Sequence, residues 1–151
     1  VCRGDIVVTL DADGSHQPEE IPRLLAPVLN GSCDVVFGSR VLNVENPPIT
    51  EFHFLGNRLF NFLIFLTTGK RFSDSQCGFR VFRASLVKGV KFSSRRFDIE
   101  AEMLMSVVKR RHRFVEIPIS CVDPGRMSRV NSFRDGFLII LKIFTSALKF
   151  W

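Results

Sequence analysis

The feature that most constrains the fold is a short apolar run that ends in two carboxylates. Residues 6–10 read Ile-Val-Val-Thr-Leu, the composition of a strand buried on both faces of a mostly parallel sheet. Asp11 and Asp13 follow directly, and Gly14 then ends the strand. Residues 18–20 (Pro-Glu-Glu) suit the first turn of a helix. This order predicts an α/β protein with both carboxylates at the carboxyl edge of its sheet, where open α/β folds bind ligands.

Two carboxylates this close repel each other unless a cation, an arginine or a shared proton compensates. We favour a Mg²⁺ or Mn²⁺ ion held by Asp11, Asp13 or both, with phosphate oxygens of a substrate completing its coordination. An isolated Asp-Ala-Asp also occurs in solvated turns that simply end a strand. The strand before the pair and the helix after it favour the metal site.

Composition limits the classes of partner. The 151 residues correspond to about one domain, and 46% of them are hydrophobic, enough for a core. The formal net charge of +6 indicates anionic partners: nucleic acid, phosphorylated small molecules or acidic lipid headgroups. Lys and Arg are scattered and form no tail, which argues against a nucleic-acid-binding arm. The four cysteines lie far apart, so neither a zinc site nor a disulfide framework is indicated.

A second buried strand is expected at residues 34–38 (Asp-Val-Val-Phe-Gly), after a short helix over residues 21–29. This β-α-β unit predicts parallel strands with a right-handed crossover. Arg40 leaves the second strand at the same edge as Asp11 and Asp13. It could balance the carboxylates or reach a phosphate, or it could be an ordinary surface arginine.

Two later segments carry groups suited to the same edge. Asp74 precedes a small-residue turn and an apolar strand, so it is either a carboxylate on the acceptor side or a residue that caps the turn. Residues 123–129 form a basic loop that contains Arg126 and Arg129 and is suited to closing on phosphates.

Two apolar segments suggest contact with a membrane surface. Residues 52–66 are strongly aromatic but shorter than the ~20 residues of a membrane-spanning helix, and polar residues interrupt them. They form either a plain core helix or one that lies half against a membrane interface. Residues 133–151 suit an interfacial helix or the approach to a membrane anchor. A third helix, expected over residues 97–111, ends in Lys-Arg-Arg, as the helix dipole prefers.

Five segments in the right order resemble the family-two glycosyltransferases, most closely the polyprenyl (dolichyl) phosphate sugar synthases. They are the Asp-x-Asp strand with its His/Pro segment at 6–18, the Gly-Ser-Arg strand end at 35–40, the Asp-x-x-Cys-Gly-Phe-Arg-x-Phe segment at 74–82, the Glu-Ile-Pro-Ile strand at 116–119 and the basic loop at 126–129. The resemblance runs from Asp5 to about Leu148. It implies the GT-A fold, with a Rossmann-like, mostly parallel sheet flanked by helices.

The resemblance also implies roles for individual residues. Asp11 and Asp13 would bind the nucleotide diphosphate and the metal. Contacts to donor or acceptor phosphates would come from Arg40, Arg58 and either Arg126 or Arg129.

The chain departs from the family pattern at two positions. Ser15 stands where the lipid-phosphate synthases often have Gln, and a serine is a poorer third metal ligand, so Gln17 or water would substitute. Arg129 stands where Lys is usual, which keeps the charge but changes the geometry of the contact.

The implied reaction is inverting transfer of a sugar from a GDP- or UDP-sugar to a polyprenyl phosphate, at the cytoplasmic face of a membrane. The metal and the arginines would stabilise the departing diphosphate, with Arg40 as a catalytic cation. A phosphate acceptor is already ionised and needs no strong base. A saccharide hydroxyl would need one, and Asp74 is then the candidate. No nucleic-acid partner is expected.

The chain starts Val-Cys-Arg-Gly-Asp, without an initiator Met or a leading strand-helix unit. A sheet whose first apparent strand already carries the site is expected to lack its beginning. In the family, that N-terminal part holds the nucleobase and ribose. We therefore expect residues 1–151 to be a single catalytic-domain fragment, truncated at its N-terminus, that binds donor poorly by itself.

Two other classes of protein share parts of this sequence pattern. Residues 11–15 resemble the Asp-x-Asp-Gly-Thr motif of haloacid dehalogenase-type phosphatases, in which Asp11 would attack phosphorus and Asp13 would act as acid and base. That family also needs a late acidic pair, and the acids after Asp74 are isolated in the sequence. A basic membrane- or RNA-binding module without chemistry would explain the charge and the 16 phenylalanines, but not the aspartate pair.

Overall fold

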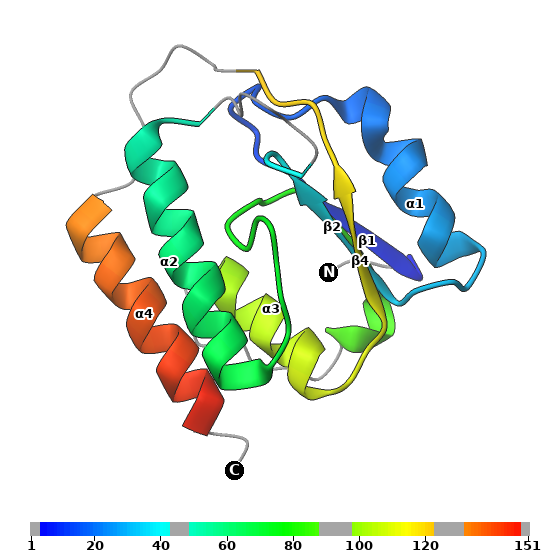
Figure 1. Cartoon of the computed structure of the whole chain (residues 1–151). Helices are drawn as coiled ribbons and strands as arrows, with labels where there is room; N and C mark the ends of the chain where they lie inside the picture. The colour runs from blue at the N-terminus through cyan, green and yellow to red at the C-terminus, as the bar shows by residue number, and fades with distance from the viewer. Residues whose placement is uncertain (1–3, 43–48, 88–97, 123–131, 149–151) are drawn as a thin grey trace.

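The computed structural model describes residues 4–42, 49–87, 98–122 and 132–148, with the side chains of residues 132 and 133 left out. It is an α/β structure in three layers (Figure 1): helix α1 covers one face of a sheet, and helices α2, α3 and α4 cover the other. The predicted α/β class with flanking helices is confirmed.

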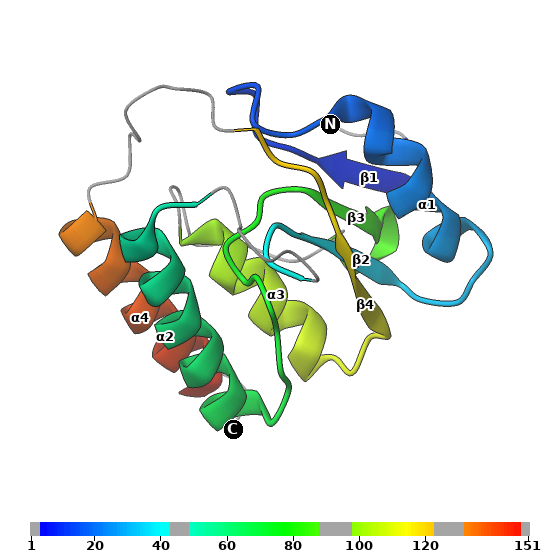
Figure 2. The ribbon, with the colours of Figure 1, turned by 45° about the horizontal axis from the view of Figure 1, so that its top comes forward.

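The described sheet contains four strands in the order β1-β3-β2-β4 (Figure 2). Their bounds are β1 Ile6–Thr9, β2 Val35–Ser39, β3 Arg80–Arg83 and β4 Phe114–Pro118. Strand β3 is antiparallel to both of its neighbours, and only β2 and β4 pair in parallel. This sheet is therefore mixed: β1, β2 and β4 run in the same direction, as expected of a mostly parallel sheet, and β3 runs against them.

The reversal of β3 has a topological cause. Helix α2 (Glu51–Thr68) carries the chain away from the edge where β2 ends, and an extended segment then brings it back (Figure 1). The Oγ atoms of Ser39 and Ser73 lie 2.7 Å apart after this return. Strand β3 consequently enters the sheet from the carboxyl edge of β1 and β2. These two strands are parallel to each other, as predicted, but β3 lies between them.

Each helix lies close to its predicted range. The bounds are α1 Ile21–Leu29, α3 Ile99–Lys109 and α4 Ser132–Leu148, with short 3₁₀ turns at Pro18–Glu20 and Ala84–Leu86. The Thr50 side chain caps α2 by accepting a hydrogen bond from the backbone N–H of His53. Gly69 ends α2 in the left-handed region, with φ 69°. Within the described part, no helix combines the length and apolarity needed to cross a bilayer.

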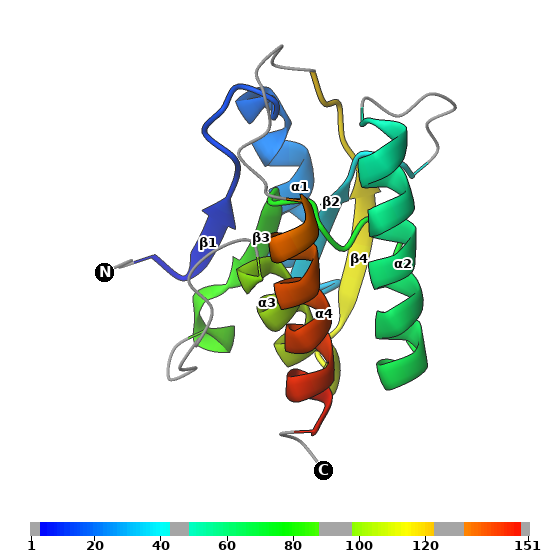
Figure 3. The same ribbon diagram turned by 90° about the vertical axis from the view of Figure 1, so that its left-hand side faces the viewer.

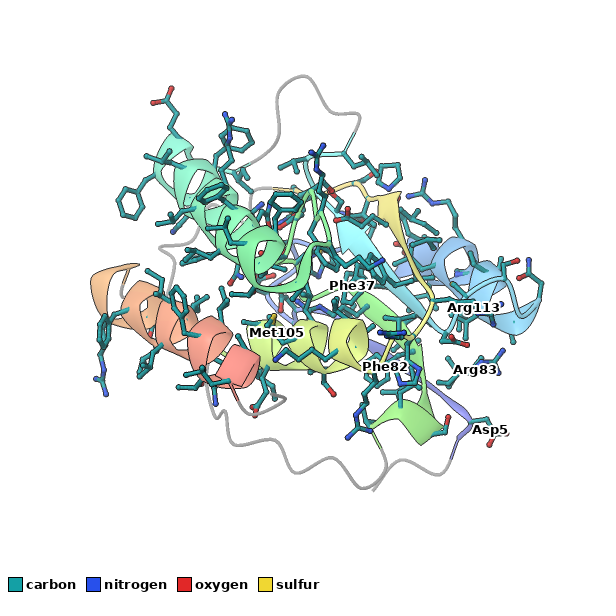
Figure 4. The ribbon with its side chains drawn as sticks, turned by 60° about the horizontal axis from the view of Figure 1, so that its bottom comes forward. Asp5, Phe37, Phe82, Arg83, Met105 and Arg113 are labelled. Carbon is teal, nitrogen blue, oxygen red and sulfur yellow. The ribbon has the colours of Figure 1, made fainter. Side chains whose placement is uncertain are left out.

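Two hydrophobic clusters, one on each face, hold the layers together. Side chains alternate along β2, so Val36 packs towards α1 while Val35 and Phe37 pack towards α3. Figure 4 shows Phe37 and Phe82 from the sheet in the layer shared with Met105 of α3. Helices α2 and α4 complete this larger cluster through Ile64, Ile139 and Ile143. Helices thus cover both faces of the sheet, which leaves the two ends of its strands for a ligand site.

Candidate active site at the carboxyl edge of the sheet

Four segments meet at one edge of the sheet: the turn after β1, the end of β2, the turn before β3 and the segment after β4 (Figure 2). The Oγ1 of Thr9 donates a hydrogen bond to the carbonyl of Gly78 (2.9 Å). The N–H of Gly38 donates to the carbonyl of Phe79 (2.8 Å). His16 forms an isolated antiparallel bridge with Cys121. The structure thereby brings Asp11, Asp13, Arg40 and Asp74 to this edge.

Arg40 and Asp74 form a bidentate ion pair. The Arg40 Nε donates to Asp74 Oδ2 (2.7 Å) and the terminal NH2 donates to Oδ1 (2.9 Å). The backbone N–H of Arg40 donates to Oδ2 as well (3.1 Å). The Asp74 side chain is 0% exposed and that of Arg40 is 20% exposed. Burial opposes the charge on Arg40, but the hydrogen bonds and charge of Asp74 outweigh it and raise the arginine's pKa.

Glu116, on β4, holds the turn that carries Asp74. Its carboxylate accepts hydrogen bonds from the N–H of Ser73 (2.9 and 3.0 Å), from the Ser73 hydroxyl (2.8 Å) and from the N–H of Asp74 (3.1 Å). A carboxylate that accepts several such bonds fixes the backbone it serves. Sequence reasoning identified Glu116 only as part of a motif and assigned it no role.

Helix α2 holds the same turn from its other side. Asn57 and Asn61 donate side-chain hydrogen bonds to the carbonyl of Ser73 (3.2 and 2.8 Å). Asn61 also accepts a bond from the N–H of Ser75 (3.2 Å). The two asparagines are four residues apart on one face of the helix, so they reach the same turn. The signal was visible in the sequence as polar breaks in an apolar helix, but it was read only as evidence against a membrane span.

Arg80 is the third support of this turn and was missed in the sequence. It is almost completely buried, and its guanidinium donates to the carbonyls of Cys77 (2.9 Å), Glu100 (2.7 Å) and Ser75 (3.0 Å). It also lies 5.3 Å from the centre of the Phe37 ring. Burial lowers the pKa of Arg80. The turn is therefore tied to the core by a charged group with no role at the surface.

Asp11 lies across the edge from this network. Its side chain is 50% exposed and packs against Gly78, where an added Cβ would come 2.5 Å from the Asp11 Oδ1. The N–H of Asp11 donates to His16 Nδ1 (3.1 Å), so Nδ1 carries no proton in this arrangement. Burial lowers the pKa of His16, which favours the neutral ring. His16 therefore fixes the backbone of Asp11 without neutralising its carboxylate.

Asp13 is exposed and accepts a hydrogen bond from the N–H of Ser15 at 2.9 Å. Ser15, through its side chain and then its backbone, lowers the pKa of the Asp13 carboxyl. Among the described residues, neither Asp11 nor Asp13 forms an ion pair with a lysine or an arginine. Within the described part of the chain, these two carboxylates at one edge thus have no lysine or arginine to balance them.

The donor set at this edge suits a hard divalent ion that is shared with phosphates. Within the described ranges, no group of three or more His, Cys, Asp or Glu side chains could hold a metal ion. Mg²⁺, however, is usually bound through one or two carboxylates, with waters and substrate phosphates completing its shell. Asp11 and Asp13 fit that pattern. Gln17 is half-buried and follows them in sequence, directly before the 3₁₀ turn.

One predicted site residue of the described part, Arg58, is not brought into this network. Arg58 is exposed on α2, where its guanidinium lies 5.9 Å from the centre of the Phe54 ring. It adjoins Asn57 in sequence, but among the described residues no hydrogen bond joins it to the Ser73 turn. Arg126 and Arg129 lie outside the described residues. The roles assigned to all these side chains remain predictions.

The family model described as "Glycosyl transferase family 2" matches residues 1–90. The chain is 33% identical over 145 residues to a UDP-N-acetylglucosamine–dolichyl-phosphate N-acetylglucosaminyltransferase of Methanococcus voltae, covering 92% of this chain and 57% of that protein. It is 30% identical over 126 residues to an undecaprenyl-phosphate mannosyltransferase of Micrococcus luteus, covering 79% and 50%.

A third relative is an undecaprenyl-phosphate 4-deoxy-4-formamido-L-arabinose transferase of Edwardsiella ictaluri, 37% identical over 117 residues, covering 78% of this chain and 34% of that protein. The chain spans about half the length of the first curated relatives it matches. The family match decides against the phosphatase alternative.

Proposed function

The chain belongs to glycosyl transferase family 2, and from this premise we propose that the protein transfers a sugar from a nucleoside diphosphate sugar to a polyprenyl phosphate, with inversion. The observation that carries the proposal is the meeting of two opposite charges at one edge. The exposed carboxylates of Asp11 and Asp13, which pair with no lysine or arginine among the described residues, lie at the same edge as a buried network that holds Arg40 in place. Relatives named for dolichyl-phosphate and undecaprenyl-phosphate acceptors support the class of acceptor.

The carboxylates of Asp11 and Asp13 serve the donor. We infer that they hold Mg²⁺ or Mn²⁺ together with the diphosphate of a GDP- or UDP-sugar, with Gln17 or water as a further ligand. A bound divalent ion supplies charge stabilisation to the departing diphosphate. Gly78 has no side chain that would collide with Asp11, and His16 holds the backbone of Asp11 in place by accepting its N–H.

Arg40 supplies a fixed positive charge to the phosphates. Asp74 occupies its Nε and one terminal nitrogen, and a guanidinium has five N–H donors, so donors remain for a ligand. A cation that is already oriented stabilises developing charge without reorganising during the reaction. Arg58, and Arg126 or Arg129, would add contacts to donor or acceptor phosphates.

The position of Asp74 favours a phosphate acceptor over a saccharide hydroxyl. A phosphate is ionised at neutral pH, whereas a hydroxyl needs a base that can reach its proton. The Asp74 carboxylate has no exposed surface and both of its oxygens bind Arg40. Asp74 therefore acts as the residue that orients Arg40. Asp74→Asn should reduce transfer to a lipid phosphate only through the loss of that orientation, whereas it should abolish transfer to a hydroxyl.

Exposed apolar side chains on two neighbouring helices support a membrane-bound acceptor. Helices α2 and α4 pack side by side and run in the same direction (Figure 3). Large apolar residues remain exposed on both. They are Phe52, Leu55, Leu59, Phe62 and Leu66 on α2, and Phe137, Leu141, Phe144 and Leu148 on α4. An apolar surface of this kind suits a membrane interface. We propose that these helices lie on the cytoplasmic face of the membrane that holds the acceptor.

The test is a transfer assay on membranes that contain the full-length protein, because the chain spans about half of its relatives. Labelled UDP- and GDP-sugars are supplied with Mn²⁺ or with a chelator, and products are extracted into organic solvent. Metal-dependent label in the organic phase is expected, and Asp13→Asn should remove it. Label that stays in the aqueous phase as an extended saccharide would contradict the lipid-phosphate acceptor.

A further inference from the structure

We propose that a basic flank beside α2 binds the anionic headgroups of phospholipids and so fixes how the protein lies on its membrane. The basic flank consists of Lys70, Arg71, Arg110, Arg111 and Arg113. The proposal rests on the membrane contact of α2 and α4 described above, and it names the lipid chemistry that this contact requires.

The flank surrounds an open depression at the end of the sheet opposite the active edge. The depression has a volume of about 710 Å³ and is lined by Lys70, Arg111, His112 and Arg113, with apolar contributions from Val108 and Phe114. Three segments converge there: the chain after α2, the end of α3 and the start of β4. Figure 4 turns this end of the molecule towards the viewer and shows Arg113 and Arg83 close together on it.

The flank carries charge that the described protein does not neutralise. Lys70, Arg110 and Arg111 are exposed and form no ion pair within the described part of the chain. Arg113 pairs with Asp34 at 3.3 Å, and Asp34 is shared with Arg83 at 3.8 Å. One carboxylate is therefore shared by two arginines. A surface with this excess of positive charge favours contact with an external anion.

Arg111 is a costly residue for its position. It lies just beyond α3 with φ 57°, the left-handed conformation in which helices usually place glycine. Its N–H donates to the carbonyl of Val108 (3.0 Å), so the turn does not depend on the side chain. The helix dipole favours a cation at this end of α3, but Arg110 already provides one, so the strained backbone at Arg111 points to a further use of its charge.

The flank is continuous with the apolar surface of α2. Lys70 and Arg71 follow directly after Gly69, where α2 ends, and the Arg71 guanidinium lies 5.2 Å from the centre of the Phe65 ring. Phe62 and Leu66, on the last turns of α2, are exposed. Apolar side chains bordered by cations are the pattern of a segment that lies in an anionic membrane interface.

The placement of the flank gives it an orienting role. Helix α2 runs from the active edge, where Asn57 bonds to the Ser73 turn, to the basic flank at the other end (Figure 1). Apolar contact along α2 and headgroup contact at its far end would together lay the helix along the membrane surface. The active edge would then lie at a fixed distance from the membrane surface, where the phosphate of the polyprenyl phosphate acceptor is located.

The experiment is co-sedimentation of the full-length protein with two kinds of vesicle: phosphatidylcholine alone, and phosphatidylcholine with part replaced by phosphatidylglycerol. Arg111→Gly removes the cation and relieves the left-handed strain, so weaker binding cannot be attributed to unfolding. Partition onto the anionic vesicles should fall about fivefold, and about as much again when Lys70→Gln is added. Binding to neutral vesicles should not change.

Two variants serve as controls. Arg111→Lys keeps the charge and should retain most of the binding. Arg23→Gln removes one charge from an exposed side chain on α1, on the other face of the sheet, and should not affect binding. Unchanged partition of the Arg111→Gly, Lys70→Gln double variant onto anionic vesicles would overturn the proposal.

The possible outcomes separate this proposal from the proposed function. Equal binding of the wild-type protein to both vesicles would refute the basic flank and leave the apolar contact intact. Binding to neither would refute the membrane contact itself. A single-stranded RNA oligonucleotide that binds the wild-type protein but not Arg111→Gly, without any preference for anionic vesicles, would overturn the proposal in favour of nucleic acid.

Discussion

The two halves of the active edge differ in how completely the protein satisfies their charges. Around Asp74, hydrogen bonds satisfy the charged groups: Arg40 binds both oxygens of the Asp74 carboxylate, and the Glu116 carboxylate accepts bonds from the turn that carries Asp74. Around Asp11 and Asp13, the carboxylates are exposed, and no lysine or arginine of the described chain pairs with them. We call the half around Asp74, Arg40 and Glu116 the assembled half, because its own residues hold it in place. We call the half around Asp11 and Asp13 the open half, because its carboxylates are exposed.

The difference indicates which ligand groups each half meets. A cation held rigidly by buried hydrogen bonds can stabilise charge that appears during a reaction, since no reorganisation is needed. Carboxylates left without a counter-charge favour a ligand that brings cations, as a metal-bound diphosphate does. The contrast leads to four predictions, in order of decreasing effect.

The assembled half should be the more sensitive one in stability. Asp74→Asn leaves the partly buried Arg40 without its counter-charge, and breaking a buried ion pair in this way costs about 3–5 kcal/mol. Urea unfolding of the two proteins measures the difference. Asp13→Asn, at an exposed site, serves as the comparison and should change stability by about 0.5 kcal/mol or less. Equal losses of unfolding free energy in the two variants would show that the two halves do not differ in this way.

The open half should be the more sensitive one in ligand-dependent activity. Asp11→Asn or Asp13→Asn should lower sugar transfer by about 10²–10³-fold, the loss typical of one group that stabilises developing charge. Melting temperature should stay the same. Asp5→Asn is the matched control, because this exposed carboxylate precedes the same strand at its other end. Transfer that survives in Asp13→Asn would remove the donor role from the open half.

Glu116→Gln tests how the assembled half is held. An amide cannot accept all the bonds that the carboxylate accepts from Ser73 and Asp74, and an unsatisfied buried partner costs about 1–3 kcal/mol. Glu19→Gln, at an exposed site, is the control. The Glu116 variant should also lower kcat more than it raises KM, since Arg40 would be displaced. A stability close to that of the control would show that Asn57, Asn61 and Arg80 hold the turn that carries Asp74 without Glu116.

The smallest effect concerns pH and Glu100, next to the buried Arg80. Burial raises the pKa of Glu100 above its ordinary value of 4.5, and the nearby Arg80 opposes this only in part. The neutral carboxyl therefore contributes stability at low pH, and this contribution is lost as pH rises through the folded pKa. Glu100→Gln should gain stability relative to the wild type between acidic and neutral pH. A constant difference across that range would show that the carboxyl does not titrate as described.

Much of the edge could be predicted from where strands end. Asp11, Asp13 and Arg40 follow strands whose composition is clear in the sequence, and parallel strands place their carboxyl ends together. The ion pair of Arg40 with Asp74 could not be predicted, because it depends on the path of the chain after α2. That path also reverses β3, which made the sheet mixed.

The supports of the site were hidden for a different reason. Asn57 and Asn61 bond to backbone groups of Ser73 and Ser75, and Arg80 bonds to the carbonyl of Glu100, and these partners come close only when the chain folds. Residue type gives no sign of such a partner. Arg111 is similar: a sequence pattern shows a cation at the end of a helix, and only the backbone shows that it occupies a glycine position.

The most direct measurement is Mn²⁺ binding by the full-length protein. Electron paramagnetic resonance reports the bound Mn²⁺, with and without a nucleoside diphosphate. The wild-type protein should bind Mn²⁺ in a diphosphate-dependent manner, and the Asp11→Asn, Asp13→Asn double variant should lose that binding while remaining folded. Undiminished Mn²⁺ binding by the double variant would contradict the proposal that the open half binds the metal and the donor diphosphate.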